Sequence, residues 1–221
     1  FVARTREEFH AARSLAALFS PEISLADPAV VRPAWQWPCL GLPALSQWQD
    51  KPSWAARLAA LYSLALGKPR VLVVSVESLL LRYMPVNFFH TRTLELGKGS
   101  DYAPELLLEQ AVEWGYERVA MVTRPGEMAR RGDILDLYPS GYARPVRLEF
   151  FGDTLEEMRF FDAETQRSLQ GCDELTLLPV SPLAFDARET EATRKRFDRM
   201  FAEGRISEND CSSFKKSLDA G

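Results

Sequence analysis

The chain has 221 residues, of which 46% are hydrophobic and 26% are charged, with a net charge of −4 and a pI of about 5.4. These values are typical of a globular protein of one or two domains, and the acidic balance does not favour a dedicated nucleic-acid-binding domain. The longest apolar runs are too short to span a bilayer.

The first residues, Phe1 to Arg4, have the composition of a strand. Thr5 and Glu8 form a capping box, which predicts a helix that continues until Pro21. Residues 28–53 are rich in proline and tryptophan and have no hydrophobic period, so we expect an irregular segment there. Because the sequence opens within an apparent strand, we expect the chain to be a piece of a longer protein.

A second helix is expected from Ser53, a favourable N-cap, to Gly67. Residues 70–76 are apolar at almost every position, which is typical of a strand covered on both faces of a parallel sheet. A short helix should follow from Glu77 to Tyr83 and end before Pro85. Residues 1–87 therefore predict an α/β domain with a parallel sheet.

The pattern then changes to short alternating segments separated by turns, with one helix at 103–114 that Gly115 ends. This pattern predicts an inserted α+β domain with an antiparallel sheet over residues 88–178. Residues 179–221 predict two further helices, at about 187–203 and from Ser207 onward. The expected strands of the inserted domain are 90–96, 117–124, 133–138, 145–151, 154–162, 166–169 and 175–180.

The sequence contains no convincing enzyme motif. Leu96 to Ser100 (LGKGS) resembles a phosphate-binding loop, but Arg92 and Gly99 stand where that motif needs a glycine and a serine or threonine. Neither GxGxxG nor GxSxG occurs, and no spacing singles out an acid–base pair of carboxylates. We therefore predict no catalytic and no cofactor-binding residues.

The cysteines give no indication of a metal site. Cys39, Cys172 and Cys211 lie far apart, and the chain has only two histidines, whereas a structural zinc site needs four closely spaced ligands. We expect three ordinary reduced thiols of a cytoplasmic protein and no bound metal.

The strand expected at 145–151 raises a specific question about its outward face. Alternation points Phe150 toward a core and places Arg147, Glu149 and Phe151 together on the other side. Arginine and aromatic side chains are common anchors of protein interfaces. The alternative is that Phe151 packs under a helix of its own domain, and alternation alone does not decide between the two.

Three linked stretches carry a family resemblance: RGDILDLYP at 131–139, PVRLEFFGD at 145–153 and FDAETQRSL at 161–169. Together they resemble the N-terminal module of the bacterial transcription-repair coupling factor, which is similar to the excinuclease B subunit. The resemblance implies a domain 1a-like unit at 1–87, a domain 2-like unit at 88–178 and the start of a domain 1b-like unit at 179–221.

The resemblance also implies a function for the protein. The family is cytoplasmic, removes stalled RNA polymerase at DNA lesions and recruits the excinuclease A subunit, UvrA. Carried over by position, Arg131, Arg147 and Phe151 are the implied UvrA-binding residues. The ATP-driven DNA translocase of that family lies elsewhere, so the resemblance implies a non-catalytic module without ATP, which another domain of the full-length protein masks.

A fragment of excinuclease B itself, an ATP-dependent DNA-repair helicase, is the alternative. Its family carries a phosphate loop and a tyrosine-rich hairpin between its first two domains. This chain passes from Pro85 directly to Phe88 and leaves no room for that hairpin.

Overall fold

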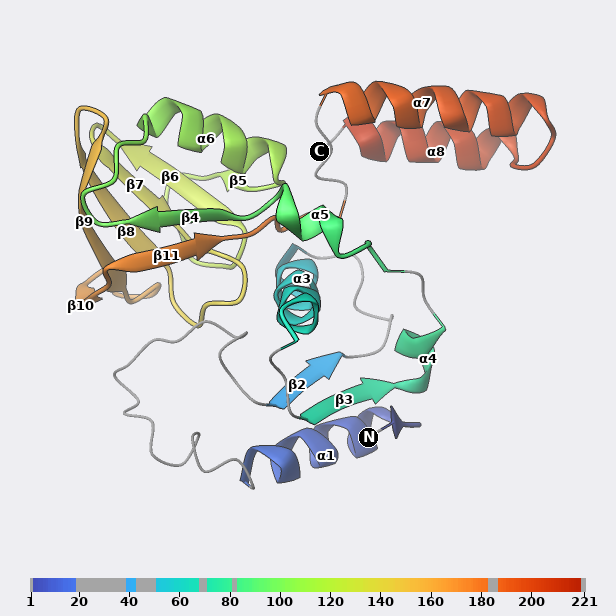
Figure 1. Ribbon diagram of the computed structural model, residues 1–221, viewed down its shortest axis with the longest axis horizontal. Helices are drawn as coiled ribbons and strands as arrows, with labels where there is room; N and C mark the ends of the chain where they lie inside the picture. The colour runs from blue at the N-terminus through green and yellow to red at the C-terminus, as the bar shows by residue number, and fades with distance from the viewer. Residues whose placement is uncertain are drawn as a thin grey trace.

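The computed structural model describes residues 2–18, 39–42, 51–67, 71–80, 83–182 and 187–219, and it contains both parallel and antiparallel sheets (Figure 1). The mixed α/β class expected from the sequence is therefore confirmed. No helix among these residues is long and apolar enough to cross a membrane.

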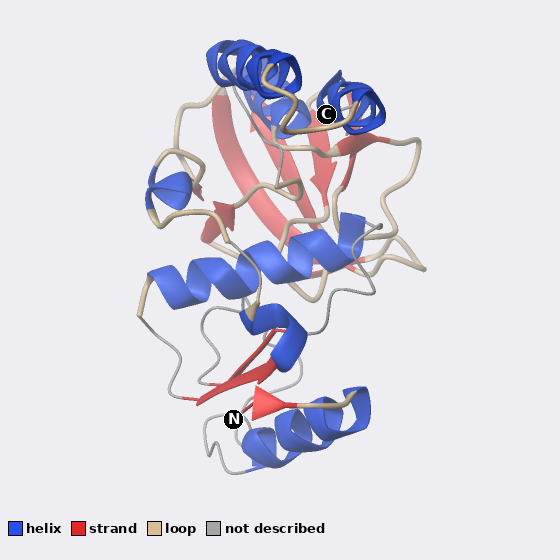
Figure 2. Ribbon diagram, turned by 90° about the vertical axis from the view of Figure 1, so that its right-hand side faces the viewer, coloured by secondary structure: helices blue, strands red, loops and turns tan. Residues whose placement is uncertain are grey.

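In the described part of the chain, three parallel strands form the first sheet, in the order β1-β3-β2. They are β1 (Val2–Ala3), β2 (Cys39–Leu42) and β3 (Val71–Ser75). Helices α1 (Arg6–Leu18) and α3 (Lys51–Ala65) lie on opposite faces of this sheet (Figures 1 and 2). The parallel sheet predicted for this part of the chain is thus confirmed.

The ends of the first helix agree in part with the predicted capping box. The hydroxyl of Thr5 accepts a hydrogen bond from the amide of Glu8 at 3.1 Å, as expected. The Glu8 carboxylate, however, accepts from the amide of Arg4 at 2.9 Å. The continuation of this helix toward Pro21 lies outside the described residues.

Three predictions for residues 28–83 need correction. Strand β2 lies inside the segment expected to be irregular, and α3 begins at Lys51, two residues before the expected cap at Ser53. The remaining residues of that segment lie outside the described ranges. Helix α4 (Val76–Leu79) starts one residue early, after Ser75, whose hydroxyl accepts from the Ser78 amide, and it ends at Leu79 rather than at Tyr83.

The second, larger sheet has six strands among the described residues, in the order β10-β9-β8-β7-β6-β5. Neighbouring strands are antiparallel except β5 and β6, which run parallel. The strands are β5 (Glu117–Arg118), β6 (Glu127–Arg131), β7 (Ile134–Leu137), β8 (Val146–Phe151), β9 (Thr154–Phe161) and β10 (Ser168–Gly171).

One face of the six-stranded sheet is covered by helix α6 (Pro104–Glu113) and by an antiparallel pair of strands, β4 (Leu94–Gly97) and β11 (Glu174–Leu177) (Figure 1). The strand predicted at 90–96 was wrong at its start, because residues Asn87–His90 form the short helix α5 and the strand begins only at Leu94. The strand predicted at 117–124 ends at Arg118, and β6 was not predicted.

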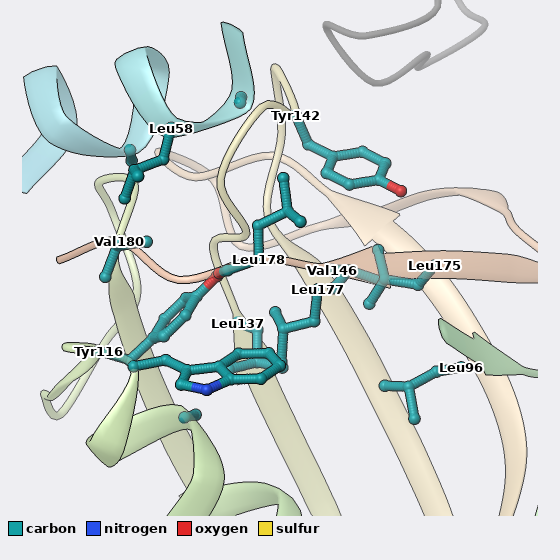
Figure 3. Packing of buried hydrophobic residues seen from close by; sticks show 14 of the residues in the cluster. Leu58, Leu96, Tyr116, Leu137, Tyr142, Val146, Leu175, Leu177, Leu178 and Val180 are labelled. Atoms are coloured by element: carbon teal, nitrogen blue, oxygen red, sulfur yellow. The ribbon is translucent and has the colours of Figure 1, made fainter. Parts of the chain in front are cut away.

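The main hydrophobic core joins α3 to the face of the larger sheet that α6, β4 and β11 cover (Figure 3). Two buried hydrogen bonds cross this region: the Tyr116 hydroxyl donates to the Leu178 carbonyl at 2.9 Å, and the Ser140 hydroxyl donates to the Ala55 carbonyl at 2.5 Å. The core residues drawn and labelled in Figure 3 are Leu58, Leu96, Tyr116, Leu137, Tyr142, Val146, Leu175, Leu177, Leu178 and Val180.

Helices α7 (Ala187–Ala202) and α8 (Glu208–Asp219) form an antiparallel hairpin that projects from the rest of the molecule (Figure 1). The rings of Phe197 and Phe214 stack between them at 3.7 Å. An ion pair between Arg92 and Glu189 joins the first turn of α7 to the region of α5. The two helices predicted after residue 179 are confirmed.

Candidate docking surface on the outer face of the sheet

The side of the larger sheet that faces away from the main core forms a distinct surface, which we call the outer face. Strand alternation and register assign its residues: on β8, for example, Val146, Leu148 and Phe150 are buried in the core and the residues between them point outward. The outer face consists of Ala129, Arg131, Ile134, Asp136, Arg147, Glu149, Phe151, Thr154, Glu157, Arg159 and Phe161.

Phe151 is the most exposed large apolar side chain on the outer face, at 75% of its surface. Its neighbour Phe150 points inward and is 6% exposed. The register shift between β8 and β9 places Glu149 opposite Glu157 and Phe150 opposite Leu155, so the extra residue lies in β9 and β8 keeps its alternation. The alternative that Phe151 packs under a helix of its own domain is therefore wrong.

Arg131 lies at the end of β6, just before a turn in which Gly132 has a φ of +62°. Its side chain is exposed on the outer face, and its Nη2 donates a hydrogen bond to the Ala120 carbonyl at 2.9 Å. Among the described residues, no carboxylate forms an ion pair with Arg131. Its positive charge is thus available to an external anionic group.

Arg147 does not lie open to water as the sequence suggested. Its side chain is only 19% exposed, because Nε and Nη2 donate to the two carboxylate oxygens of Asp136 at 2.8 and 2.9 Å. The guanidinium also lies over the ring of Phe161, 4.9 Å from its centroid. The prediction that Arg147 shares a face with Phe151 is correct, but its charge is already partnered within the sheet.

The remaining charges of the outer face form a second group of ion pairs. Arg159 contacts Glu149 at 2.7 Å and Glu157 at 3.3 Å, and Lys98 approaches Glu157 at 3.3 Å. These pairs are partly exposed and each contributes little to stability. Their consequence is that the carboxylates of this face are matched by cations of the same chain.

One end of the outer face is covered by residues 119–123 and by the turn between β9 and β10. Val122 packs with the buried Ala129 and Phe161, and Gln166, whose φ is +59°, donates to the Val122 carbonyl at 3.1 Å. Hydrogen bonds from the amide of Thr165, and the guanidinium of Arg144, lower the pKa of Asp162 in this turn to about 2. The opposite end, with Ile134 and Phe151, is left accessible.

The three residues expected from the family resemblance therefore lie on one face, on β6 and β8, which are separated by β7. Sequence reasoning missed two of their neighbours, Ile134 and Asp136, which lie between them on β7. The signal was present, because alternation in Ile134–Leu137 already places these two side chains on the same side as each other.

The turn that resembles a phosphate-binding loop, LGKGS at 96–100, does not have the geometry of one. The amides of the LGKGS turn are used inside the protein: Lys98 donates to Asp173, Gly99 to Leu155 and Ser100 to Gly97. They do not form the cradle that a phosphate needs. Among the described residues no group of histidine, cysteine and carboxylate side chains could hold a metal ion.

Two of the three cysteines lie where their side chains are described. Cys172 and Cys211 are free, as expected, and burial raises the pKa of the Cys172 thiol to about 11. A thiol with so high a pKa is a poor nucleophile near neutral pH. The side chain of Cys39 lies outside the described part.

Comparisons with known proteins show what this chain is similar to. Residues 94–182 match the family of the UvrB interaction domain. The chain is 34% identical over 180 residues to the transcription-repair-coupling factor of Escherichia coli K12, and 31% identical over 199 residues to that of Haemophilus influenzae. These matches cover 81% and 90% of this chain but only 16% of each relative, so the chain spans about a sixth of their length. The factor of Myxococcus xanthus is 34% identical over 148 residues, 66% of this chain and 12% of the relative.

Proposed function

Because residues 94–182 belong to the UvrB interaction domain family, in a chain homologous to part of the bacterial transcription-repair-coupling factors, we propose that this protein is a non-catalytic module that recruits UvrA. In this proposal the recruitment serves transcription-coupled nucleotide excision repair. The α/β unit at 1–87 and the helices after residue 179 then correspond to domains 1a and 1b of that family, on either side of the docking domain.

The observation that carries the proposal is the exposure of Phe151. A phenylalanine ring that stays three-quarters in water gains nothing for its own fold, and exposed aromatic side chains flanked by arginine are typical anchors of protein interfaces. Phe151 lies at the accessible end of the outer face, where Ile134 adds a second apolar side chain. Arg131 adds a cation there that forms no ion pair with any carboxylate in the described part of the chain.

The chemistry of this surface indicates what UvrA should present to it. An apolar pocket would take the ring of Phe151, and a carboxylate beside it would pair with Arg131. The carboxylates of the outer face are matched by Arg147, Arg159 and Lys98, so they do not repel an acidic partner as strongly as bare charges would.

The activities of the full-length family complete the proposal. We assign ATP-driven translocation on DNA and the displacement of RNA polymerase to parts of the longer protein beyond this chain, and we place that protein in the cytoplasm. This chain is expected to bind neither ATP nor a metal, and another domain of the longer protein is expected to mask the outer face. Addition of Mg-ATP should therefore leave its melting temperature unchanged.

Replacing Phe151 by alanine tests the proposal. The affinity for purified UvrA, measured by isothermal titration calorimetry, should fall about 30-fold, which corresponds to roughly 2 kcal/mol for a lost anchor. Because the ring is exposed, the free energy of unfolding should change by less than about 0.5 kcal/mol.

Leu106→Ala is the matched control. Leu106 is 57% exposed on α6, on the other side of the sheet, so its removal deletes a similar exposed apolar side chain away from the outer face. UvrA affinity should not change in this variant. Equal affinities of the wild type, Phe151→Ala and Leu106→Ala would contradict docking through the outer face.

A further inference from the structure

Asp136 is the most deeply buried carboxylate of the outer face. It lies in the middle of β7 and is 2% exposed, although it belongs to a face that is otherwise partly open to water. Burying a carboxylate is costly unless both of its oxygens are hydrogen-bonded and its charge is compensated. Its position therefore calls for a specific partner.

That partner is Arg147, directly opposite on β8. The two planar groups meet in a two-pronged arrangement, with hydrogen bonds of 2.8 and 2.9 Å. Phe161 supports the guanidinium from below, 4.9 Å from the ring centroid. Arg147 is thus fixed on two sides, by a carboxylate and by an aromatic ring that is itself fully buried.

The register between β8 and β9 explains why the contact between Asp136 and Arg147 matters. On its other side Arg147 lies directly opposite Arg159 of β9, so two like charges face each other across the strands. Asp136 draws one guanidinium toward β7, while Glu149 and Glu157 engage the other. Without Asp136 the Arg147 guanidinium would keep the Phe161 ring but lose both hydrogen bonds that direct it toward β7.

We propose that Asp136 is a positioning residue for UvrA docking: itself too buried to touch the partner, it holds the Arg147 guanidinium over the ring of Phe161 and so fixes the surface that the partner meets. This inference rests on the proposed recruitment of UvrA. In this inference Asp136 affects UvrA binding only through Arg147. If Arg147 contacted UvrA without needing to be held in place, Asp136 would have no effect on binding.

The first test is a double-mutant cycle, with UvrA affinity measured by calorimetry on the full 221-residue chain. Asp136→Asn keeps the shape of the side chain but removes its charge, and it should weaken binding about tenfold. In the Arg147→Ala background the same change should have an effect below twofold, because the group that Asp136 positions is already gone. An unchanged affinity in Asp136→Asn, or the same loss in both backgrounds, would overturn the inference.

A second variant keeps the test decisive if Asp136→Asn fails to fold. Arg147→Lys retains the positive charge but cannot form the two-pronged contact. It should weaken UvrA binding nearly as much as Arg147→Ala, and binding equal to that of the wild type would overturn the inference. Glu105→Gln is the matched control, because it breaks a carboxylate–arginine pair with Arg130 on the α6 side and should leave the affinity unchanged.

The outcome also separates this inference from the proposed function. If Phe151→Ala weakens binding and both Asp136→Asn and Arg147→Lys do not, recruitment through the outer face stands and only the positioning role fails. If the wild-type chain itself does not bind UvrA, both are overturned.

Discussion

At the scale of single residues, one carboxylate, that of Asp162, holds together the turn within residues 161–169. An oxygen of Asp162 accepts hydrogen bonds from the amides of Glu164 and Thr165 at 3.2 and 2.9 Å, and from the Thr165 hydroxyl at 3.0 Å. The other oxygen accepts from Arg144 at 2.7 Å. Asp162 thereby shapes the turn that places Gln166 against Val122, which helps to cover one end of the outer face.

Asp162→Asn should produce a stability change that depends on pH. Folding lowers the pKa of this carboxyl from its ordinary value of 3.8 to about 2, so the folded state favours the ionised form. The ionised group therefore stabilises the protein above about pH 4, and this contribution disappears as the pH falls through 2.

Urea unfolding of the wild type and of Asp162→Asn at pH 6, 4 and 2.5 checks this prediction. The wild type should be more stable at pH 6, and the difference between the two proteins should shrink steadily toward pH 2.5. A difference that stays constant over this range would show that the charge of Asp162 has no role.

At the scale of elements, alternation of polar and apolar residues predicted the direction of side chains within one strand better than it predicted which residues of neighbouring strands pair. The sequence of β8 alternates over its full length, so Phe151 could be placed outward correctly. Strand β6, with the sequence EMARR, has no alternation of polar and apolar residues, because Arg130 points toward α6, where it pairs with Glu105. Because the charged Arg130 stands at an inward-facing position, the sequence of β6 does not show the pattern of a strand.

The partner of Arg147 could not be predicted for a related reason. Whether Asp136 faces Arg147 depends on the register between β7 and β8, which the connecting loop sets and which alternation within either strand leaves open. The same limit applies to residues 119–124, which have the composition of a strand but leave the sheet after Arg118 to pack over Phe161. These are tertiary contacts, and no local pattern contains them.

Arg131→Ala should loosen the segment 119–123. The guanidinium of Arg131 ties this segment to the end of β6 through the Ala120 carbonyl, so its loss removes one of the bonds that keep the segment on the sheet. Hydrogen–deuterium exchange should become faster at residues 119–123 and stay unchanged in β8.

Arg167→Ala provides the comparison for this experiment, because Arg167 is an exposed arginine on the turn after β9. Its removal should not alter exchange at residues 119–123. Equal exchange in Arg131→Ala and the wild type would show that the bond to Ala120 does not restrain the segment.

At the scale of the whole molecule, the described parts before and after residue 87 share a hydrophobic core. Leu58 of α3 is fully buried and belongs to the same cluster as Leu137 and Val180, which come from the antiparallel part and its exit (Figure 3). Helix α3 lies between the parallel sheet and the part of the chain that forms the larger sheet (Figure 2), and most of its residues from Ala55 to Ser63 are buried. The parallel sheet and the larger six-stranded sheet should therefore unfold together.

Leu58→Ala tests this shared core. The substitution should lower the free energy of unfolding by about 2–5 kcal/mol, the usual cost of a cavity at a fully buried leucine. Far-UV circular dichroism and tryptophan fluorescence should report the same urea midpoint in the variant, as expected for one cooperative unit.

Leu15→Ala is the control for the shared core, because Leu15 is exposed on α1 and its loss should cost less than about 0.5 kcal/mol. Two separate transitions in Leu58→Ala, one for each spectroscopic signal, would contradict a common core.

The exposed ring of Phe151 has a consequence for how this surface is inherited. Because Phe151 contributes little to the stability of the native state, selection for folding alone does not preserve it. A lineage in which this surface no longer binds a partner would therefore be free to replace the ring. Asp136 and Arg147 are constrained differently, because replacing either one leaves the charge of the other without its partner. Homologous chains should therefore keep or lose the two residues together.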